Sequence, residues 1–306
     1  MTREKHANVP ASVRQKLLNI IRKTGDDPNL VWSRYATERL LYRLSISEFA
    51  GEFVLKGAML FTVWSGEPHR PTVDLDLLGH GNDSGERIAN VFRQICRMDV
   101  KDDGLVFDAD NIRVSSIRED LEYHGQRVNL VAHLGKARIP IQVDIGFGDV
   151  ITPKAEDIEY PTLLELPAPR IRAYPRETVV AEKLHAMVVL GIANSRMKDF
   201  YDLHMLASRF AFDGAILARA VKATFKRRKT PVPSVMPLAL TEEFGHDVAK
   251  NVQWNAFIRK GSLKHKALDL MEVVALLREF LFPITKAATD QVAPPKHWDA
   301  GGPWVM

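Results

Sequence analysis

A short run in which apolar and polar residues alternate, Thr72–Leu77, restricts the fold of this chain more than any other feature. The alternation has the period of a β-strand, so Asp74 and Asp76 project together from one face while their neighbours face a core. Aspartate is depleted in strands, and two adjacent carboxylates repel each other. The run therefore predicts a strand that binds a divalent cation, since Mg²⁺ and Mn²⁺ prefer such oxygen ligands. The alternative is a half-exposed strand whose aspartates only face solvent.

A third aspartate lies in a later segment that is also predicted to be a strand. Arg127–Leu134 and Arg138–Ile145 are expected to form a hairpin around the turn Gly135-Lys136. In the second of these strands the apolar residues share one face, which leaves Asp144 on the other. If this strand lies beside Thr72–Leu77, three carboxylates converge. Sites of that kind hold two metals about 3.5–4 Å apart for phosphoryl or nucleotidyl transfer.

The remaining patterns predict an α/β (α+β) protein with two lobes. Residues 1–150 would form an α/β lobe with N-terminal helices, and residues 151–175 contain five prolines and indicate an extended crossover. Helical periodicity dominates residues 176–285. The final segment, 286–306, is rich in proline and glycine and is predicted to be a loose tail.

The composition of the 306 residues excludes several classes of protein. No stretch approaches ~18 consecutive apolar residues, so a membrane-spanning helix is not expected. The first ten residues lack the apolar region of a secretory signal. A single cysteine, Cys96, excludes an internal disulfide framework and a Cys-based zinc cluster. We therefore expect a reduced, cytoplasmic protein.

The charge is nearly balanced, but the basic residues are concentrated at one place. The 42 Lys and Arg against 38 Asp and Glu give a net charge of +4, which by itself indicates no partner. The segment 222–229 contains five cations and no acid. Such a cluster is most often a solvated helix face, but in an enzyme with a polynucleotide substrate it would form an RNA-docking surface. The five cations are Lys222, Lys226, Arg227, Arg228 and Lys229.

Four motifs, in order, resemble those of a known enzyme family. Phe53–Ala58 followed by Arg70–Leu77 is similar to the nucleotidyltransferase signature of the DNA polymerase β superfamily, in which a glycine turn precedes a strand with two acidic residues. Glu182–Ala186 and Arg196–Leu203 resemble the helical lysine motif and the Lys-Asp-x-x-Asp motif of the AbiEii/AbiGii toxin family, which includes the MenT-type toxins. The resemblance covers roughly residues 50–210. It implies a nucleotidyltransferase-like mixed sheet followed by a helical C-terminal lobe.

The resemblance also implies an activity. The chain would be a metal-dependent nucleotidyltransferase using Mg²⁺ or Mn²⁺, and a toxin of a type IV-like toxin–antitoxin or phage-defence system. It would transfer an NMP from an NTP to an RNA, such as a tRNA 3′ end, and its partner would be an AbiEi-type antitoxin. The expected metal ligands are Asp74, Asp76 and Asp144. The expected catalytic residues are these three with Lys183, Asp199 and Asp202, and the expected nucleotide contacts are Lys56, Gly57, Ala58, Arg70, Thr72, Arg196 and Lys198.

Several of these residues also have simpler interpretations. Lys183 could be a surface lysine whose stem lies along an apolar stripe, and Asp199 could belong to a local charge network with Arg196 rather than orient the acceptor hydroxyl. Asp202 could instead hold Lys183 or Arg196 in place. The turn Gly57-Ala58-Met59 lacks the hydroxyl that the family's turn usually carries, although Gly57 still permits close approach of a phosphate to the backbone.

Two other functions are therefore open at this point. The departure at the turn favours a nucleotide- or RNA-binding protein without transfer activity, whereas the clustered carboxylates argue against it, because they would repel a phosphate backbone. A nucleotidyltransferase could also act on a hydroxyl group of a protein or of a small molecule. The basic segment 222–229 favours RNA as the acceptor.

Overall fold

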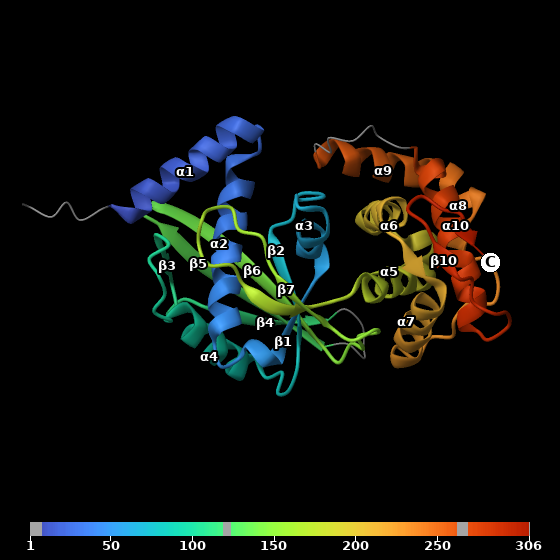
Figure 1. The fold of residues 1–306 in the computed structure, drawn as a ribbon, viewed down its shortest axis with the longest axis horizontal. Coiled ribbons are helices and arrows are strands. Elements are labelled where there is room, and N and C mark those ends of the chain that lie inside the picture. The colour runs from blue at the N-terminus through green and yellow to red at the C-terminus, as the bar shows by residue number, and fades with distance from the viewer. Residues whose placement is uncertain (1–7, 119–123, 262–268, 306) are drawn as a thin grey trace, which may run out of the picture. The chain divides into compact units, whose positions relative to one another are not determined.

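The computed structural model describes residues 8–118, 124–261 and 269–305, which form two compact units. The sheet unit comprises the chain up to Gly148 together with Glu156–Ala173. The helical unit comprises Asp149–Ala155 together with the chain from Tyr174 onward. The mixed α/β class predicted from the sequence is confirmed (Figure 1).

The sheet unit contains an eight-stranded mixed sheet in the order β3-β5-β6-β2-β1-β8-β7, with β4 also paired to β5. The pairs β2–β6 and β1–β8 are parallel, and the other pairs are antiparallel. The predicted hairpin is present as β5 and β6. The strands are β1 (Phe53–Lys56), β2 (Asp74–Gly79), β3 (Leu105–Phe107), β4 (Arg113–Arg118), β5 (His124–Leu134), β6 (Ala137–Phe147), β7 (Glu156–Glu159) and β8 (Arg170–Ala173).

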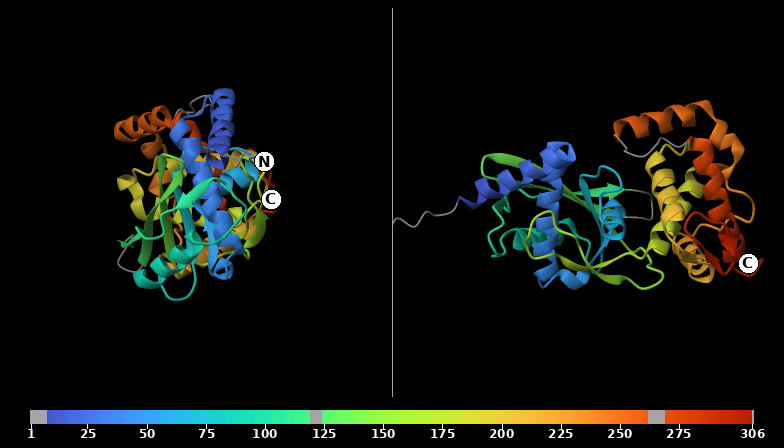
Figure 2. Two further views of the ribbon diagram at one scale, coloured as in Figure 1. Left: turned by 90° about the vertical axis from the view of Figure 1, so that its left-hand side faces the viewer. Right: turned by 45° about the horizontal axis from the view of Figure 1, so that its top comes forward.

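Helices cover one face of this sheet, and local sequence signals set where they begin and end. The Asn8 side chain caps the first helix, which ends at Gly25 in the left-handed conformation, with φ of 71°. Asp27 caps the second, whose first residue is Pro28. Figures 1 and 2 show α2 and α4 along the sheet. The helices are α1 (Val9–Thr24), α2 (Pro28–Ile46), α3 (Leu60–Ser65) and α4 (Gly85–Cys96), with 3₁₀ turns η1 (Ala50–Glu52) and η2 (Gly57–Met59).

The proline-rich segment differs from the extended crossover predicted for residues 151–175, because much of it belongs to the sheet unit. Its strands β7 and β8 pair with each other, and β8 also lies beside β1. Two fully buried side chains of α2 hold the connection between them. Glu38 accepts the N–H of Leu163 at 2.7 Å, and Arg39 donates to the carbonyl of Pro167 at 2.7 Å. Burial raises the pKa of Glu38 to about 7.

The helical unit packs its helices around a common apolar core. The stretch predicted to be helical, 176–285, also contains a short strand and several 3₁₀ turns. The helices are α5 (Arg176–Leu190), α6 (Met197–Arg209), α7 (Gly214–Arg227), α8 (Glu242–His246), α9 (Val248–Lys260) and α10 (Leu270–Ala288). The short elements are η3 (Gly191–Ala193), β9 (Phe212–Asp213), η4 (Leu238–Leu240), β10 (His297–Trp298) and β11 (Trp304–Val305).

The C-terminal segment differs from the predicted loose tail. Strands β10 and β11 form a small sheet with β9, and Trp298 is fully buried. The Trp298 indole donates to the carbonyl of Ala207 at 2.7 Å, and that of Trp304 donates to the carbonyl of Phe280 at 2.9 Å. Two large aromatic side chains thus anchor a segment whose proline and glycine content predicts disorder, because their burial removes much apolar area from water.

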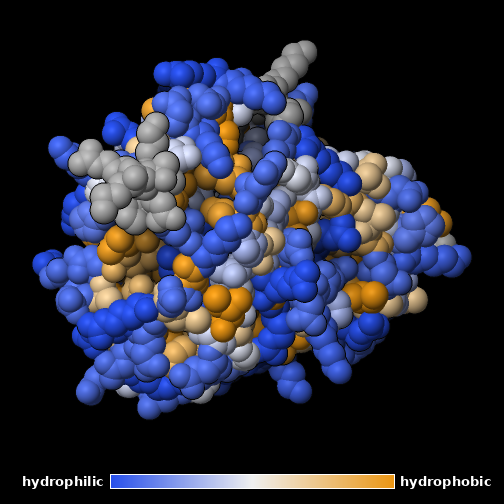
Figure 3. All heavy atoms as spheres, turned by 60° about the vertical axis from the view of Figure 1, so that its left-hand side comes forward, coloured by the Kyte–Doolittle hydropathy of each residue, from blue (hydrophilic) through white to orange (hydrophobic). Residues whose placement is uncertain are grey.

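None of the helices in the described ranges combines the length and the hydropathy that a bilayer-spanning segment needs. On the face drawn in Figure 3, hydrophilic side chains surround small groups of apolar ones.

Candidate active site

The two aspartates of β2 lie where the alternating run predicts them. Asp74 and Asp76 are half-buried and share one face of the strand, while Leu75 and Leu77 are fully buried on the other. The parallel pairing of β2 with β6 sets Asp76 opposite Asp144. Adjacent strands lie about 4.8 Å apart, so these two carboxyl groups are neighbours on one face of the sheet. The predicted convergence of three strand aspartates is thus present in the strand register.

The glycine turn lies against the same aspartates. Lys56, the last residue of β1, is the register partner of Asp76. Gly57 follows in the left-handed conformation with φ of 75°, and a Cβ at this position would meet Oδ2 of Asp76 at 1.9 Å. Only glycine fits here, because any larger residue would displace the carboxylate. The structure therefore gives Gly57 a steric role beside Asp76, and Ala58 continues the turn as part of η2.

The remaining residues expected to contact a nucleotide in the sheet unit precede β2. Arg70 and Thr72 are both half-buried and lie between α3 and β2. The Arg70 guanidinium lies 3.5 Å from the carbonyl oxygen of Pro71. Both residues are therefore close in sequence to Asp74.

An arginine that the motifs do not identify binds the third aspartate. Arg127 of β5 is the register partner of Asp144, and its Nε and Nη2 donate to the two carboxylate oxygens at 2.8 and 2.7 Å. The Nε2 of Gln142 lies 3.3 Å from the same carboxylate. The hydrogen bonds to Asp144, followed by the charges of Asp144, Asp74 and Asp76, raise the pKa of Arg127. This arginine therefore lies in the field of all three carboxylates.

Three strand aspartates of the sheet unit share one face, and Arg127 holds one of them. Among the described residues, no three His, Cys, Asp or Glu side chains come together as a ready group of metal ligands. Asp74, Asp76 and Asp144 nevertheless offer hard oxygen ligands in adjacent register positions. Their combined negative charge, felt by Arg127, is the electrostatic environment that a divalent cation requires.

Replacing Arg127 by Ala is expected to tighten Mn²⁺ binding by roughly 3- to 10-fold, because it removes a half-exposed cation that competes for Asp144. Isothermal titration calorimetry of Mn²⁺ into the purified protein measures the change. Arg113→Ala is the matched control, since Arg113 lies on the adjacent strand β4 and forms no ion pair among the described residues. Equal affinities in the two variants would contradict the competition.

The lysine motif and the Lys-Asp-x-x-Asp motif meet inside the helical unit. The Lys183 ammonium of α5 donates to Oδ1 of Asp199 at 2.7 Å and to Oδ2 of Asp202 at 2.8 Å, both on α6. The Nε of Arg196 lies 2.7 Å from the second oxygen of Asp199. Both carboxylates are fully buried, whereas the Lys183 side chain retains 14% of its exposure. Two buried anions thus fix one lysine whose side chain still reaches the surface.

These contacts decide between the alternative structural interpretations of Lys183, Asp199 and Asp202. Asp202 holds Lys183, which was one of its two interpretations. Asp199 shares that task and also binds Arg196, and its complete burial leaves no exposed atom for a substrate. Lys183 is more buried than a surface lysine, because it is enclosed by two carboxylates rather than extended along the helix. Lys198 is exposed.

The basic segment at the end of α7 divides into two parts. Arg228 belongs to an internal network, where its guanidinium lies 3.2 Å from Asp149, 3.7 Å from Glu182 and 3.3 Å from the ring of His185. The other four cations are exposed, and Lys222 forms an ion pair with Asp290. The four exposed residues are Lys222, Lys226, Arg227 and Lys229. Arg228 is therefore not part of a solvent-facing cluster.

The hairpin itself contains a signal that would identify Arg127. The two-residue turn Gly135-Lys136 pairs Leu134 with Ala137, and counting outward from it sets Arg127 opposite Asp144. Motif comparison misses Arg127 because this residue lies between the second motif, which ends at Leu77, and the third, which begins at Glu182.

Comparison with known proteins agrees with the order of the motifs. The sequence model of a family described as "Nucleotidyl transferase AbiEii toxin, Type IV TA system" matches residues 39–275. None of the curated proteins matches the sequence. A crystal structure of a nucleotidyltransferase candidate from H. pylori has a TM-score of 0.51 at 15% identity, covering 87% of this chain and 99% of that one. That of JHP933 from Helicobacter pylori has a TM-score of 0.47 at 15% identity, over 84% and 93%. The first likeness shows a shared fold, and the second carries no argument.

Proposed function

This chain belongs to the AbiEii nucleotidyl transferase toxin family and is a nucleotidyltransferase, and we propose that it transfers an NMP from an NTP to a hydroxyl group of an RNA acceptor. In this reaction the acceptor oxygen forms a bond to the α-phosphorus while the bond to pyrophosphate breaks. The observation that carries the proposal is the strand register, which sets Asp76 between Lys56 on one side and Asp144 on the other, with Asp74 on the same face.

We assign Asp74, Asp76 and Asp144 as the residues that would hold Mg²⁺ or Mn²⁺. When bound, the metal would neutralise charge on the triphosphate and favour ionisation of the attacking hydroxyl. In the structure, Arg127 neutralises the Asp144 carboxylate. When the substrate complex takes the place of Arg127 at Asp144, the two-pronged guanidinium group of Arg127 would be free to bind a phosphate oxygen. Asp144, with both carboxylate oxygens directed to one side of the sheet, is also the candidate to accept the proton of the acceptor hydroxyl.

Gly57, Lys56 and Lys183 are the residues that we propose to position the nucleotide. Gly57 lets the backbone approach a phosphate group, and Lys56 provides a cation beside Asp76. Lys183 would neutralise charge on the triphosphate, and Asp199 and Asp202 would act on the reaction only by fixing that lysine. Most of the rate enhancement would then come from positioning and fixed charges.

The exposed end of α7 supports RNA as the acceptor. Four exposed cations follow one another in sequence at and just after this helix end, one of them, Lys222, paired with Asp290, and such a cluster attracts a phosphate backbone whatever its sequence. The family's description also implies a type IV toxin–antitoxin system, so we propose an AbiEi-type antitoxin as the partner. We propose the cytoplasm as the location, because the single cysteine of the sequence, Cys96, is a buried free thiol and no disulfide framework is possible within the chain.

Incubation of the purified protein with each α-³²P-labelled NTP, Mg²⁺ and total tRNA tests this proposal. We expect one nucleotide to label the RNA, and the double variant Asp74→Ala/Asp76→Ala to give no label. A third variant, in which Lys222, Lys226 and Lys229 are changed to Glu, should lose transfer to RNA but keep NTP binding, because only exposed cations are reversed.

The outcomes separate the possible acceptors. Label on the protein itself would replace RNA by a protein hydroxyl group, and label on a small molecule would replace it by that compound. If no NTP labels any acceptor, and calorimetry detects no metal-dependent NTP binding, the proposed reaction is overturned for this chain.

A further inference from the structure

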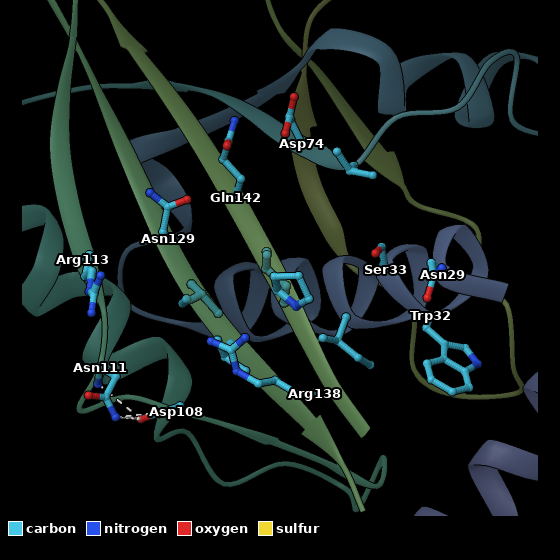
Figure 4. Close-up of a pocket in the computed structure, with 16 residues that line it drawn as sticks. Asn29, Trp32, Ser33, Asp74, Asp108, Asn111, Arg113, Asn129, Arg138 and Gln142 are labelled. Atoms are coloured by element: carbon cyan, nitrogen blue, oxygen red, sulfur yellow. Dashed lines mark hydrogen bonds between the residues drawn. The ribbon is translucent and has the colours of Figure 1, made fainter. Parts of the chain in front are cut away.

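A groove of about 790 Å³ begins at Asp74 and continues across the polar face of the sheet unit. Asn129 and Gln142 stand side by side on neighbouring strands, with Asp74 beyond Gln142 and Arg113 on the other side of Asn129 (Figure 4). Trp32 of α2 also lines the groove. The motifs do not point to this groove, since all of these residues except Asp74 lie outside the motif segments.

The floor of the groove is a row of polar side chains in strand register. Arg113 is opposite Asn129, Asn129 is opposite Gln142, and Gln142 is opposite Asp74. The row therefore crosses the four strands β4, β5, β6 and β2 and spans about 14 Å at the usual strand spacing. It leads directly to a carboxylate of the proposed reaction centre.

The chemistry of the lining suits a single-stranded nucleotide chain. The amide of Asn129 offers both donors and an acceptor, and that of Gln142 keeps its oxygen and one N–H besides the bond to Asp144; base edges require such groups. Arg113 and Arg138 are exposed, and neither forms an ion pair among the described residues, so their guanidinium groups can bind phosphate. The Nε1 of Trp32 is buried without a hydrogen-bond partner within the described ranges, and the Arg14 guanidinium lies over the indole ring, 5.9 Å from its centroid.

The acidic side chain at the far end, Asp108, is bonded within its own loop and stays negatively charged. Asp108 accepts hydrogen bonds from the backbone N–H of Asn111 at 3.2 Å and from its Nδ2 at 3.0 and 2.9 Å. These bonds lower the pKa of Asp108, and the carboxylate is satisfied by its own loop. The groove thus has two arginines available to phosphate and two carboxylates, of which Asp108 is hydrogen-bonded to Asn111 and Asp74 belongs to the proposed metal site.

The strand order decides which of the two substrates the groove would take. Gly57 and Lys56 lie on the β1 side of β2, whereas the groove lies on the β6, β5 and β4 side. If the triphosphate occupies the glycine turn, the groove is left for the molecule that supplies the attacking hydroxyl.

We propose that this groove binds the single-stranded 3′ end of the RNA acceptor and directs its terminal hydroxyl to the Asp74 end. The proposal rests on the proposed nucleotidyl transfer to RNA and adds where the acceptor binds. Arg113 and Arg138 contact its phosphates, and Asn129 and Gln142 contact its terminal bases.

Fluorescence anisotropy with a 5′-fluorescein-labelled single-stranded oligoribonucleotide, in Mg²⁺ and without NTP, tests the site independently of transfer. The double variant Arg113→Glu/Arg138→Glu is expected to bind roughly tenfold more weakly than the wild type, because two phosphate contacts become repulsive. The control Arg22→Glu/Arg170→Glu makes the same charge change at exposed positions of the same unit outside the groove. Asn129→Leu, which leaves the charge unchanged, should also weaken binding several-fold.

Steady-state kinetics then assign the substrate. The groove variant should raise KM for RNA and leave KM for the NTP unchanged. A rise in KM for the NTP alone, equal weakening in the groove and control variants, or a wild type that does not bind the oligonucleotide would overturn the inference. If the wild type binds RNA through the groove but labels no acceptor, the proposed reaction fails while the binding site stands.

Discussion

Replacing Asp76 by Asn is expected to lower kcat for nucleotidyl transfer by roughly 10³-fold or more. The amide keeps the shape of the side chain but removes one negative charge from the three adjacent carboxylates. Metal-based charge stabilisation contributes several kcal/mol to reactions of this class, and each ~1.4 kcal/mol corresponds to a factor of ten. The assay is transfer of α-³²P-labelled NMP, accompanied by calorimetric titration of Mn²⁺, which should show weaker binding in the same variant.

Two further variants make this result specific. Asp99→Asn removes the charge of an exposed aspartate in the same unit and should leave both transfer and Mn²⁺ binding unchanged. Gly57→Ala keeps Asp76 but places a Cβ 1.9 Å from the present position of its carboxylate oxygen, so it should reduce both properties by displacing that group. If the kcat of Asp76→Asn is within a factor of about ten of the wild-type kcat, Asp76 is not a ligand of the metal.

Replacing Lys183 by Met is expected to lower the free energy of unfolding by about 3 kcal/mol, because two fully buried carboxylates lose their common cation. Urea denaturation followed by circular dichroism measures the change. Lys226→Met, which removes an exposed lysine of the same unit, should change stability by only a few tenths of a kcal/mol.

A triple variant separates the structural role of Lys183 from its proposed role in the reaction. The triple variant Lys183→Met/Asp199→Asn/Asp202→Asn has no charged side chain at these three positions. It should therefore regain most of the stability that Lys183→Met alone loses. The folded variant should still transfer poorly, with a raised KM for the NTP, since no ammonium remains for the triphosphate. Transfer at the wild-type rate would show that the lysine serves only to join α5 and α6.

Much of the sheet unit follows from local patterns. Alternation predicts which face of β2 carries Asp74 and Asp76, because successive strand residues point to opposite sides. The turn Gly135-Lys136 predicts the hairpin, and its register sets Arg127 opposite Asp144. The comparison with nucleotidyltransferases likewise depends on motifs that are each contained within a few consecutive residues.

The state of each ionisable side chain depends instead on partners that are distant in the chain. Lys183 is bound by two aspartates of another helix. Arg228 forms an ion pair with Asp149 and is therefore less exposed than the cations beside it in the sequence. The C-terminal segment is ordered by the burial of Trp298, although its composition predicts a loose tail. The amino-acid pattern determines local conformation and the face on which a residue lies. Only folding decides which charges are removed from water and which partner compensates them, because desolvation and pairing depend on everything that surrounds the group.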